Sequence, residues 1–91
     1  MNNSAILFIH GGPGLSSSYF RGWFTDLEKT FDLLFYDQNY DIPNDANAIE
    51  FLTSELIKKL HDIVKKYNRV VIFAHSWGVF LVLQAFNKLL T

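Results

Sequence analysis

The stretch from Val70 to Gly78 constrains the fold of this chain more than any other. It begins with Val-Val-Ile-Phe-Ala, a run rich in β-branched and aromatic residues that predicts a buried strand. A His-Ser-Trp-Gly turn follows, and an apolar helical pattern begins directly after it. A strand, a tight turn and a helix in this order raise the hydroxyl of Ser76 above the edge of a sheet. The first backbone N–H groups of the helix then point toward whatever that hydroxyl contacts.

Two further apolar runs predict strands. Ala5–Ile9 and Phe31–Tyr36 are near-continuous apolar segments, as is Val70–Ala74. Strands of this kind are typical of parallel sheets, because both faces of such a sheet are covered.

Helical patterns lie between and after these strands. Large apolar side chains recur at i, i+3, i+4 and i+7 and predict an amphipathic helix with an aromatic face: Phe20, Trp23, Phe24 and Leu27. From Asn47 to about Tyr67 the apolar residues step by three and four, and Asn47 with Glu50 resembles a capping box. Val79–Leu90 is apolar nearly all round, which is typical of a helix that is buried on most sides.

The predicted order is β-α-β-α-β-α, which indicates the α/β class. Right-handed crossovers predict a three-stranded parallel sheet with the spatial order 2-1-3. The first helix is then expected on one face of the sheet and the other two on the opposite face. We expect residues 1–91 to form a single truncated domain.

Composition excludes several function classes. Eight basic and nine acidic residues leave no basic stripe, so nucleic acid is not an expected partner. No apolar run approaches the ~20 residues of a membrane span, so no membrane association is expected. The absence of cysteine suits the cytosol, and we predict a cytoplasmic protein. No cofactor or metal site is predicted, although Asp37, Asp41 and Asp45 recur at intervals of four.

Two unusual loops are expected at the same edge of the sheet. His10–Gly14 ends the first strand with three glycines and a proline, and His75–Gly78 ends the third. In the order 2-1-3 these strands are neighbours, and ligands of open α/β sheets bind where the strand order reverses. The sequence therefore predicts a site between the two loops.

The residues of these loops resemble a known family. Ala74–Gly78 resembles the nucleophile elbow of the α/β-hydrolases, with alanine in place of the first glycine. His10–Gly14 resembles their oxyanion loop in the form found in the proline iminopeptidase branch, and Phe35–Gln38 resembles the end of the next strand there. The similarity covers nearly all of this chain but only about the middle third of a whole family domain.

The resemblance implies a serine hydrolase that transfers an acyl group to water. It implies that Ser76 is the nucleophile and that the backbone N–H groups of Gly12 and Trp77 are the oxyanion donors. Such donors stabilise charge that develops in the transition state, and losing one typically costs ~100- to 1,000-fold in rate. The expected partner is a peptide with a free N-terminus, or a small ester or amide.

The sequence also departs from the family pattern. Asn39–Pro43 stands where the family has an Arg-Gly loop, and the family's catalytic acid and histidine lie downstream of the elbow. The histidines present are His10, expected to be structural; His75, expected to point away from the serine; and His61, expected in water. A serine hydroxyl needs a base, so we expect the fragment to be inactive alone.

Two other functions remain open at this point. Gly12-Pro13-Gly14 after a strand, with Asp37 closing the next one, resembles a dinucleotide fingerprint and would indicate a nucleotide-binding module. Alternatively the chain is an inactive remnant that acts through self-association. Whichever function holds, open sheet edges and the apolar last helix predict a homodimer or higher oligomer, or else contacts with a missing remainder of the protein.

Overall fold

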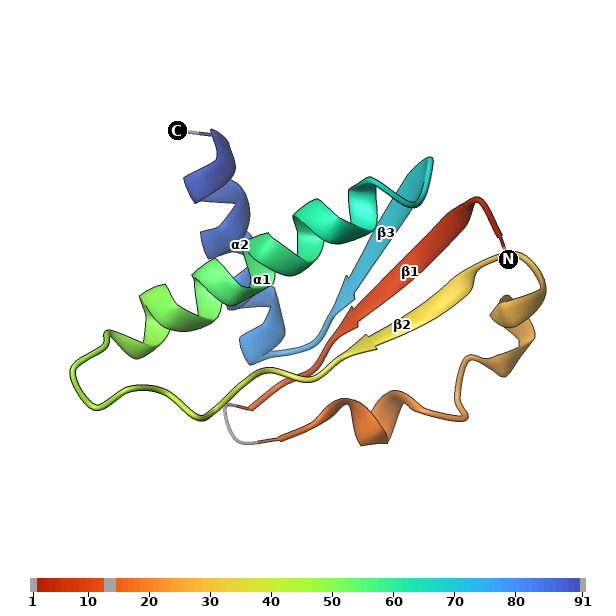
Figure 1. Cartoon of the computed structure of the whole chain (residues 1–91). Coiled ribbons are helices and arrows are strands. Elements are labelled where there is room, and N and C mark those ends of the chain that lie inside the picture. Colours follow the sequence, from red (N-terminus) through yellow and green to blue (C-terminus); the bar gives the residue numbers. More distant parts are fainter. Residues whose placement is uncertain (1, 13–14, 91) are drawn as a thin grey trace.

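A parallel sheet and two α-helices make up the computed structural model, which describes residues 2–12 and 15–90 (Figure 1). Within these residues the elements run in the following order: β1 (Ser4–Ile9), the 3₁₀ helices η1 (Ser17–Phe20) and η2 (Thr25–Lys29), β2 (Asp32–Tyr36), α1 (Ala48–Val64), β3 (Arg69–Ala74) and α2 (Trp77–Leu90). The three predicted strands are confirmed to within one residue at each end.

The sheet has the order β2-β1-β3 with both pairings parallel, as predicted. In register, Ile9 lies beside Tyr36 of β2 and beside Ala74 of β3. All three strands therefore end at one edge of the sheet, where the loops that follow them meet.

The central strand divides the core in two. Leu7 and Ile9 of β1 pack with the buried faces of α1 and α2, whereas Ile6 and Phe8 pack on the opposite side with Phe20. This alternation follows from the pleat of a strand, which sends successive side chains to opposite faces. It places α1 and α2 together on one face of the sheet, as expected.

The helix α1 begins where the sequence predicts. The side chain of Asn47 accepts a 3.2 Å hydrogen bond from the backbone N–H of Glu50, so it satisfies one of the unpaired N–H groups of the first turn. The helix ends at Val64, three residues before the predicted end.

The predicted amphipathic helix over Phe20–Leu27 is wrong. Two 3₁₀ helices, η1 and η2, occupy this region, and between them Gly22 adopts φ +87°. That left-handed conformation interrupts any right-handed helix. Trp23, which the pattern assigned to an aromatic face, is 80% exposed.

Aromatic packing nevertheless covers this second face of the sheet. The ring of Phe8 lies 5.4 Å from that of Phe20 and 5.1 Å from that of Phe24, measured between centroids. It also stacks on Phe35 at 4.9 Å. Helical turns therefore cover both faces of the sheet as expected, but on this face they are two 3₁₀ helices in place of the one amphipathic helix.

Most of the last helix, α2, is exposed. Only Gly78, Leu81 and Ala85 of α2 are buried within the described residues. In the part of the chain that the structure describes, no helix is long and apolar enough to cross a membrane.

Candidate functional site

Ser76 lies at the junction of β3 and α2 in a strained conformation. Its φ of 54° makes it the one residue other than glycine with a positive φ among those described. The backbone turns at once into the helix, because Gly78 N–H donates to His75 O at 2.9 Å and Val79 N–H to Ser76 O at 2.9 Å. Strained backbone of this kind persists only where the surroundings enforce it, and it gathers at functional sites. The side chain of Ser76 is exposed above the sheet edge.

The turn after Ser76 brings position 78 so close to β1 that no side chain fits there. A Cβ atom at this position would lie 2.5 Å from the carbonyl oxygen of Ile9 and 2.8 Å from that of His10. Both contacts are with backbone, which cannot move aside without disturbing β1. The first turn of α2 therefore lies directly against the end of β1, and only glycine fits there.

The glycine loop after β1 lies against the elbow. A Cβ atom on Gly11 would meet Nδ1 of His75 at 3.2 Å, so the two loops are in close contact. The N–H of Gly11 donates to the hydroxyl oxygen of Tyr19. Gly12 adopts φ +127°, which favours glycine. Pro13 and Gly14 of the predicted oxyanion loop lie outside the described residues.

Two backbone N–H groups at this edge find no acceptor among residues 2–12 and 15–90. Among the described residues, no hydrogen bond is formed by the N–H of Gly12 or by that of Trp77, which is the first residue of α2. The first N–H groups of a helix lack partners within it and carry partial positive charge. These are the two groups that the sequence assigns as oxyanion donors, and that assignment stays a prediction.

Gln38 joins the three loops, a role that sequence analysis missed. Its buried side chain donates from Nε2 to His10 O at 2.9 Å, and its Oε1 accepts from Trp77 Nε1 at 2.8 Å and from Tyr40 Oη at 3.2 Å. Its backbone N–H donates to Nε2 of His10 at 3.0 Å. One amide thus holds together the residues that follow β1, β2 and β3. The one available signal was its position just after the second predicted strand.

The histidines are placed as the sequence predicts in two cases. His10 is fully buried; Nε2 accepts from Gln38, so the proton sits on Nδ1, which donates to Gly11 O at 2.6 Å. His61 is exposed on α1, near the opposite end of β3 from Ser76.

His75 is held by Tyr19 and not by the serine. The Tyr19 hydroxyl lies 3.3 Å from Nδ1 of His75, and the two rings meet edge to face. Within residues 2–12 and 15–90, no histidine is hydrogen-bonded to the hydroxyl of Ser76. A base for that hydroxyl is therefore not assembled by the described residues.

Asp37 has a structural partner. Its carboxylate accepts a 2.7 Å hydrogen bond from the backbone N–H of Ser17, and this bond holds the pKa of Asp37 below its ordinary value. The residues that follow the glycine loop form the four-residue η1, not the long helix whose N-terminus binds a dinucleotide's pyrophosphate. This removes the main support for a nucleotide-binding module. No group of three or more acidic, histidine or cysteine side chains suited to a metal occurs in the described part of the chain.

Curated relatives match nearly the whole chain. A proline iminopeptidase of Lactobacillus delbrueckii subsp. lactis is 28% identical over 89 residues, which cover 90% of this chain and 30% of the relative. A probable aminopeptidase, YbaC, of Bacillus subtilis is 26% identical over 98 residues, or 97% of this chain and 31% of the relative. The chain therefore spans about a third of the length of these proteins.

No family model matches the chain, and no solved structure matches it significantly. The relatives connect this α/β fragment with hydrolases at low identity.

Proposed function

We propose that this chain carries the nucleophile and the oxyanion donors of a serine hydrolase. The observation that carries the proposal is Ser76 at φ 54° on a strand-to-helix turn, next to the N–H of Trp77, which has no acceptor among the described residues. A turn with only a structural role does not require serine in this left-handed conformation, because glycine or asparagine adopts it at lower cost. The similarity to a proline iminopeptidase and a probable aminopeptidase supports the same function.

In the proposed reaction, Ser76 Oγ attacks the acyl carbon of a peptide, ester or amide, and its proton passes to a base. The carbonyl oxygen becomes an oxyanion between the N–H groups of Gly12 and Trp77. The leaving amine or alcohol takes the proton as the acyl bond breaks. Water then hydrolyses the acyl-serine and regenerates the hydroxyl.

The base is the part that the described residues do not supply. His10 is buried within the Gln38 network, His75 pairs with Tyr19, and His61 lies away from the elbow. Loss of the base in a triad enzyme costs on the order of a million-fold in rate. We therefore propose that the 91 residues alone are inactive and that activity requires an acid and a histidine from further sequence.

A chimera tests this proposal. Residues 1–91 replace the matched segment of the Lactobacillus delbrueckii proline iminopeptidase, and the purified protein is assayed with a chromogenic N-terminal proline substrate and a fluorophosphonate probe. We expect hydrolysis and one probe adduct by intact mass, and both should disappear in Ser76→Ala.

Ser54→Ala is the matched control, because Ser54 is an exposed serine on α1 far along the chain from the elbow. It should label as the unmodified chimera does. A chimera that folds by circular dichroism yet neither labels nor hydrolyses the substrate would refute the proposal. The 91-residue chain alone should remain unlabelled.

A further inference from the structure

Side chains hold two successive peptide units of the glycine loop. In the first unit, the carbonyl oxygen of His10 accepts from Gln38 Nε2 at 2.9 Å. The N–H of Gly11, at the other end of this unit, donates to the hydroxyl oxygen of Tyr19. In the second unit, the carbonyl oxygen of Gly11 accepts from His10 Nδ1 at 2.6 Å. The remaining group of the two units is the N–H of Gly12, which has no acceptor among the described residues.

These bonds determine where the N–H of Gly12 points. A peptide unit is planar and trans, so its N–H points opposite to its carbonyl oxygen. Because His10 holds the carbonyl of Gly11, the N–H of Gly12 points away from the buried imidazole. Glycine by itself prefers no single backbone conformation, so the loop needs these contacts to give the N–H one direction.

Tyr19 is the member of this set that also contacts the turn around Ser76. Its hydroxyl oxygen accepts from Gly11 and has one proton left to donate. Nδ1 of His75 lies 3.3 Å from that oxygen, and the two rings meet edge to face with centroids 5.7 Å apart. His75 directly precedes Ser76 in the chain. The hydroxyl therefore bridges the glycine loop and the turn that begins α2.

The ring of Tyr19 is itself anchored in the fold. Its centroid lies 4.5 Å from that of Phe20, which is buried in the aromatic core beneath the sheet. Both residues belong to η1, whose first N–H, that of Ser17, is held by the carboxylate of Asp37 at 2.7 Å. The position of the hydroxyl is thus set by the core as well as by the two groups that it contacts.

We propose, on the basis of the hydrolase function proposed above, that Tyr19 is a positioning residue of the site. Its hydroxyl fixes the N–H of Gly12 relative to the N–H of Trp77, so that both donors meet the same oxyanion. Donors of this kind lower the barrier because they are in place before the charge develops. A displacement of ~1 Å can cost ~100-fold in rate. Tyr19 itself contacts no reacting atom in the proposed reaction.

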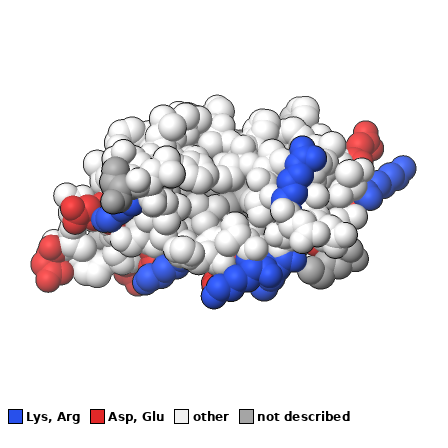
Figure 2. All heavy atoms as spheres, turned by 90° about the horizontal axis from the view of Figure 1, so that it is seen from above, with Lys and Arg blue, Asp and Glu red and all other residues white. Residues whose placement is uncertain are grey.

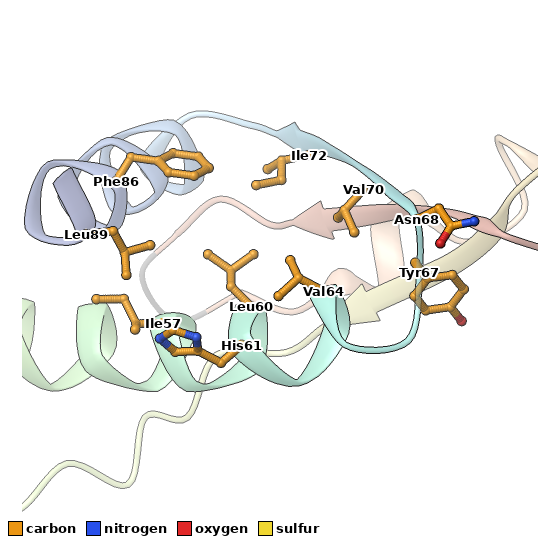
Figure 3. A pocket seen from close by; sticks show the side chains of 10 residues that line it. All are labelled: Ile57, Leu60, His61, Val64, Tyr67, Asn68, Val70, Ile72, Phe86 and Leu89. Carbon is orange, nitrogen blue, oxygen red and sulfur yellow. The ribbon is translucent and has the colours of Figure 1, made fainter.

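An apolar groove of about 430 Å³ lies elsewhere on the molecule. Figure 3 shows it between α1, β3 and α2, with Tyr67 and Asn68 at the end where β3 begins. Among the described residues, no Lys, Arg, Asp or Glu lines it, and in the view from above the upper middle of the molecule shows no charged side chain (Figure 2). Ser76 and the glycine loop do not line it either. A change at Tyr67 therefore leaves the loops around Ser76 untouched and is a reference for a change at Tyr19.

Tyr19→Phe in the chimera described above tests the proposal, because it removes the hydroxyl and keeps the ring. We expect kcat to fall ~10- to 100-fold while KM for the proline substrate changes less than ~2-fold, since the donors act on charge that exists only in the transition state. An aldehyde analogue of the substrate forms a tetrahedral adduct on Ser76 and places an oxygen between the same N–H groups. Its affinity should fall by the same factor as kcat.

Tyr67→Phe is the matched control. The Tyr67 hydroxyl also makes a hydrogen bond, to Asp32 at 2.7 Å, but at the opposite edge of the sheet, where the strands begin. This variant should keep its kcat and its affinity for the aldehyde. Equal kcat values for the two variants in an active chimera would overturn the role of Tyr19 and leave the proposed function standing. A folded chimera that is inactive with Tyr19 intact would instead refute the proposed function and the role of Tyr19 together.

Amide NMR of the 91-residue chain provides a second measurement that needs no catalysis. Selective labelling of the 5 glycines gives separate backbone signals for Gly11 and Gly12. In Tyr19→Phe we expect the N–H of Gly11 to exchange with solvent at least ~10-fold faster and the signal of Gly12 to broaden, because the loop loses a fixed contact. Tyr67→Phe should leave both signals unchanged. Unchanged exchange of Gly11 in Tyr19→Phe would overturn the proposal.

Discussion

The indole Nε1 of Trp77 donates a 2.8 Å hydrogen bond to Oε1 of Gln38. This bond joins the first residue of α2, directly after Ser76, to the loop that follows β2. Through the same amide both are tied to His10 at the end of β1. The turn around Ser76 is therefore positioned by the polar network of Gln38 as well as by its own backbone hydrogen bonds. The contribution of this network to the free energy of unfolding can be measured.

Gln38→Leu should lower the free energy of unfolding by ~2–4 kcal/mol, because it leaves the buried His10 carbonyl and the half-buried Trp77 indole N–H without their partner. Urea denaturation followed by tryptophan fluorescence measures the change. Gln84→Leu, at the one other glutamine of the chain, is the control; no hydrogen bond of its side chain occurs among the described residues. Similar losses for the two variants would contradict a structural role for the network.

Gly78→Ala should destabilise the chain by ~1–3 kcal/mol, since its Cβ would press on the carbonyl oxygens of Ile9 and His10. Helix propensity alone predicts the opposite, a gain of ~1 kcal/mol. Gly22→Ala is a useful comparison, because it forces a φ of +87° on alanine with no atom within 4 Å of the new Cβ. It should cost only ~1–2 kcal/mol. A thermal melt in which Gly22→Ala loses more than Gly78→Ala would show that close packing is not what selects Gly78.

The strands and their order could be predicted because each strand is a continuous apolar run, and each is separated from the next by enough residues for a helical crossover. The parallel arrangement and the handedness of crossovers then leave few alternatives. The same reasoning predicts that His10–Gly14 and His75–Gly78 lie at one edge of the sheet, and the close approach of Gly11 to His75 agrees with it.

Other features depend on contacts that periodicity does not encode. The spacing of Phe20 and Leu27 matches a helix, but Gly22 between them takes a left-handed conformation. The side chain of Gln38 bonds to residues 28 and 39 positions away, so no local pattern marks it. The apolar pattern of α2 is typical of a buried helix, but the pattern does not say which part of a protein covers it.

Acid should weaken the fold partly through Asp32. Its Oδ2 accepts from the Tyr67 hydroxyl at 2.7 Å, and its Oδ1 from the backbone N–H of Asn2 at 3.1 Å. These bonds hold the pKa of Asp32 below its ordinary value of 3.8, the Tyr67 bond most. The stabilisation is thus present above about pH 4 and is lost as pH falls through the lowered pKa.

Tyr67→Phe and Asp32→Asn should therefore be less stable than the unmodified chain at pH 6, with the difference shrinking toward pH 3. Urea melts across this range measure it. Tyr40→Phe serves as control, because its hydroxyl donates to the neutral amide of Gln38, and its deficit should not change with pH. A deficit of Tyr67→Phe that stays constant from pH 6 to pH 3 would contradict the assignment.

Ser76→Gly should be more stable than Ser76→Ala by ~0.5–1.5 kcal/mol. Both lose the hydroxyl, but at φ 54° alanine keeps the clash of Cβ with the backbone, whereas glycine relieves it. The entropy that glycine adds to the unfolded chain opposes this gain, so the difference stays below the full cost of the left-handed conformation. Paired urea titrations of the two variants give the value directly. Equal stabilities, or a more stable Ser76→Ala, would mean that the turn holds no strain and that serine at this position needs no functional explanation.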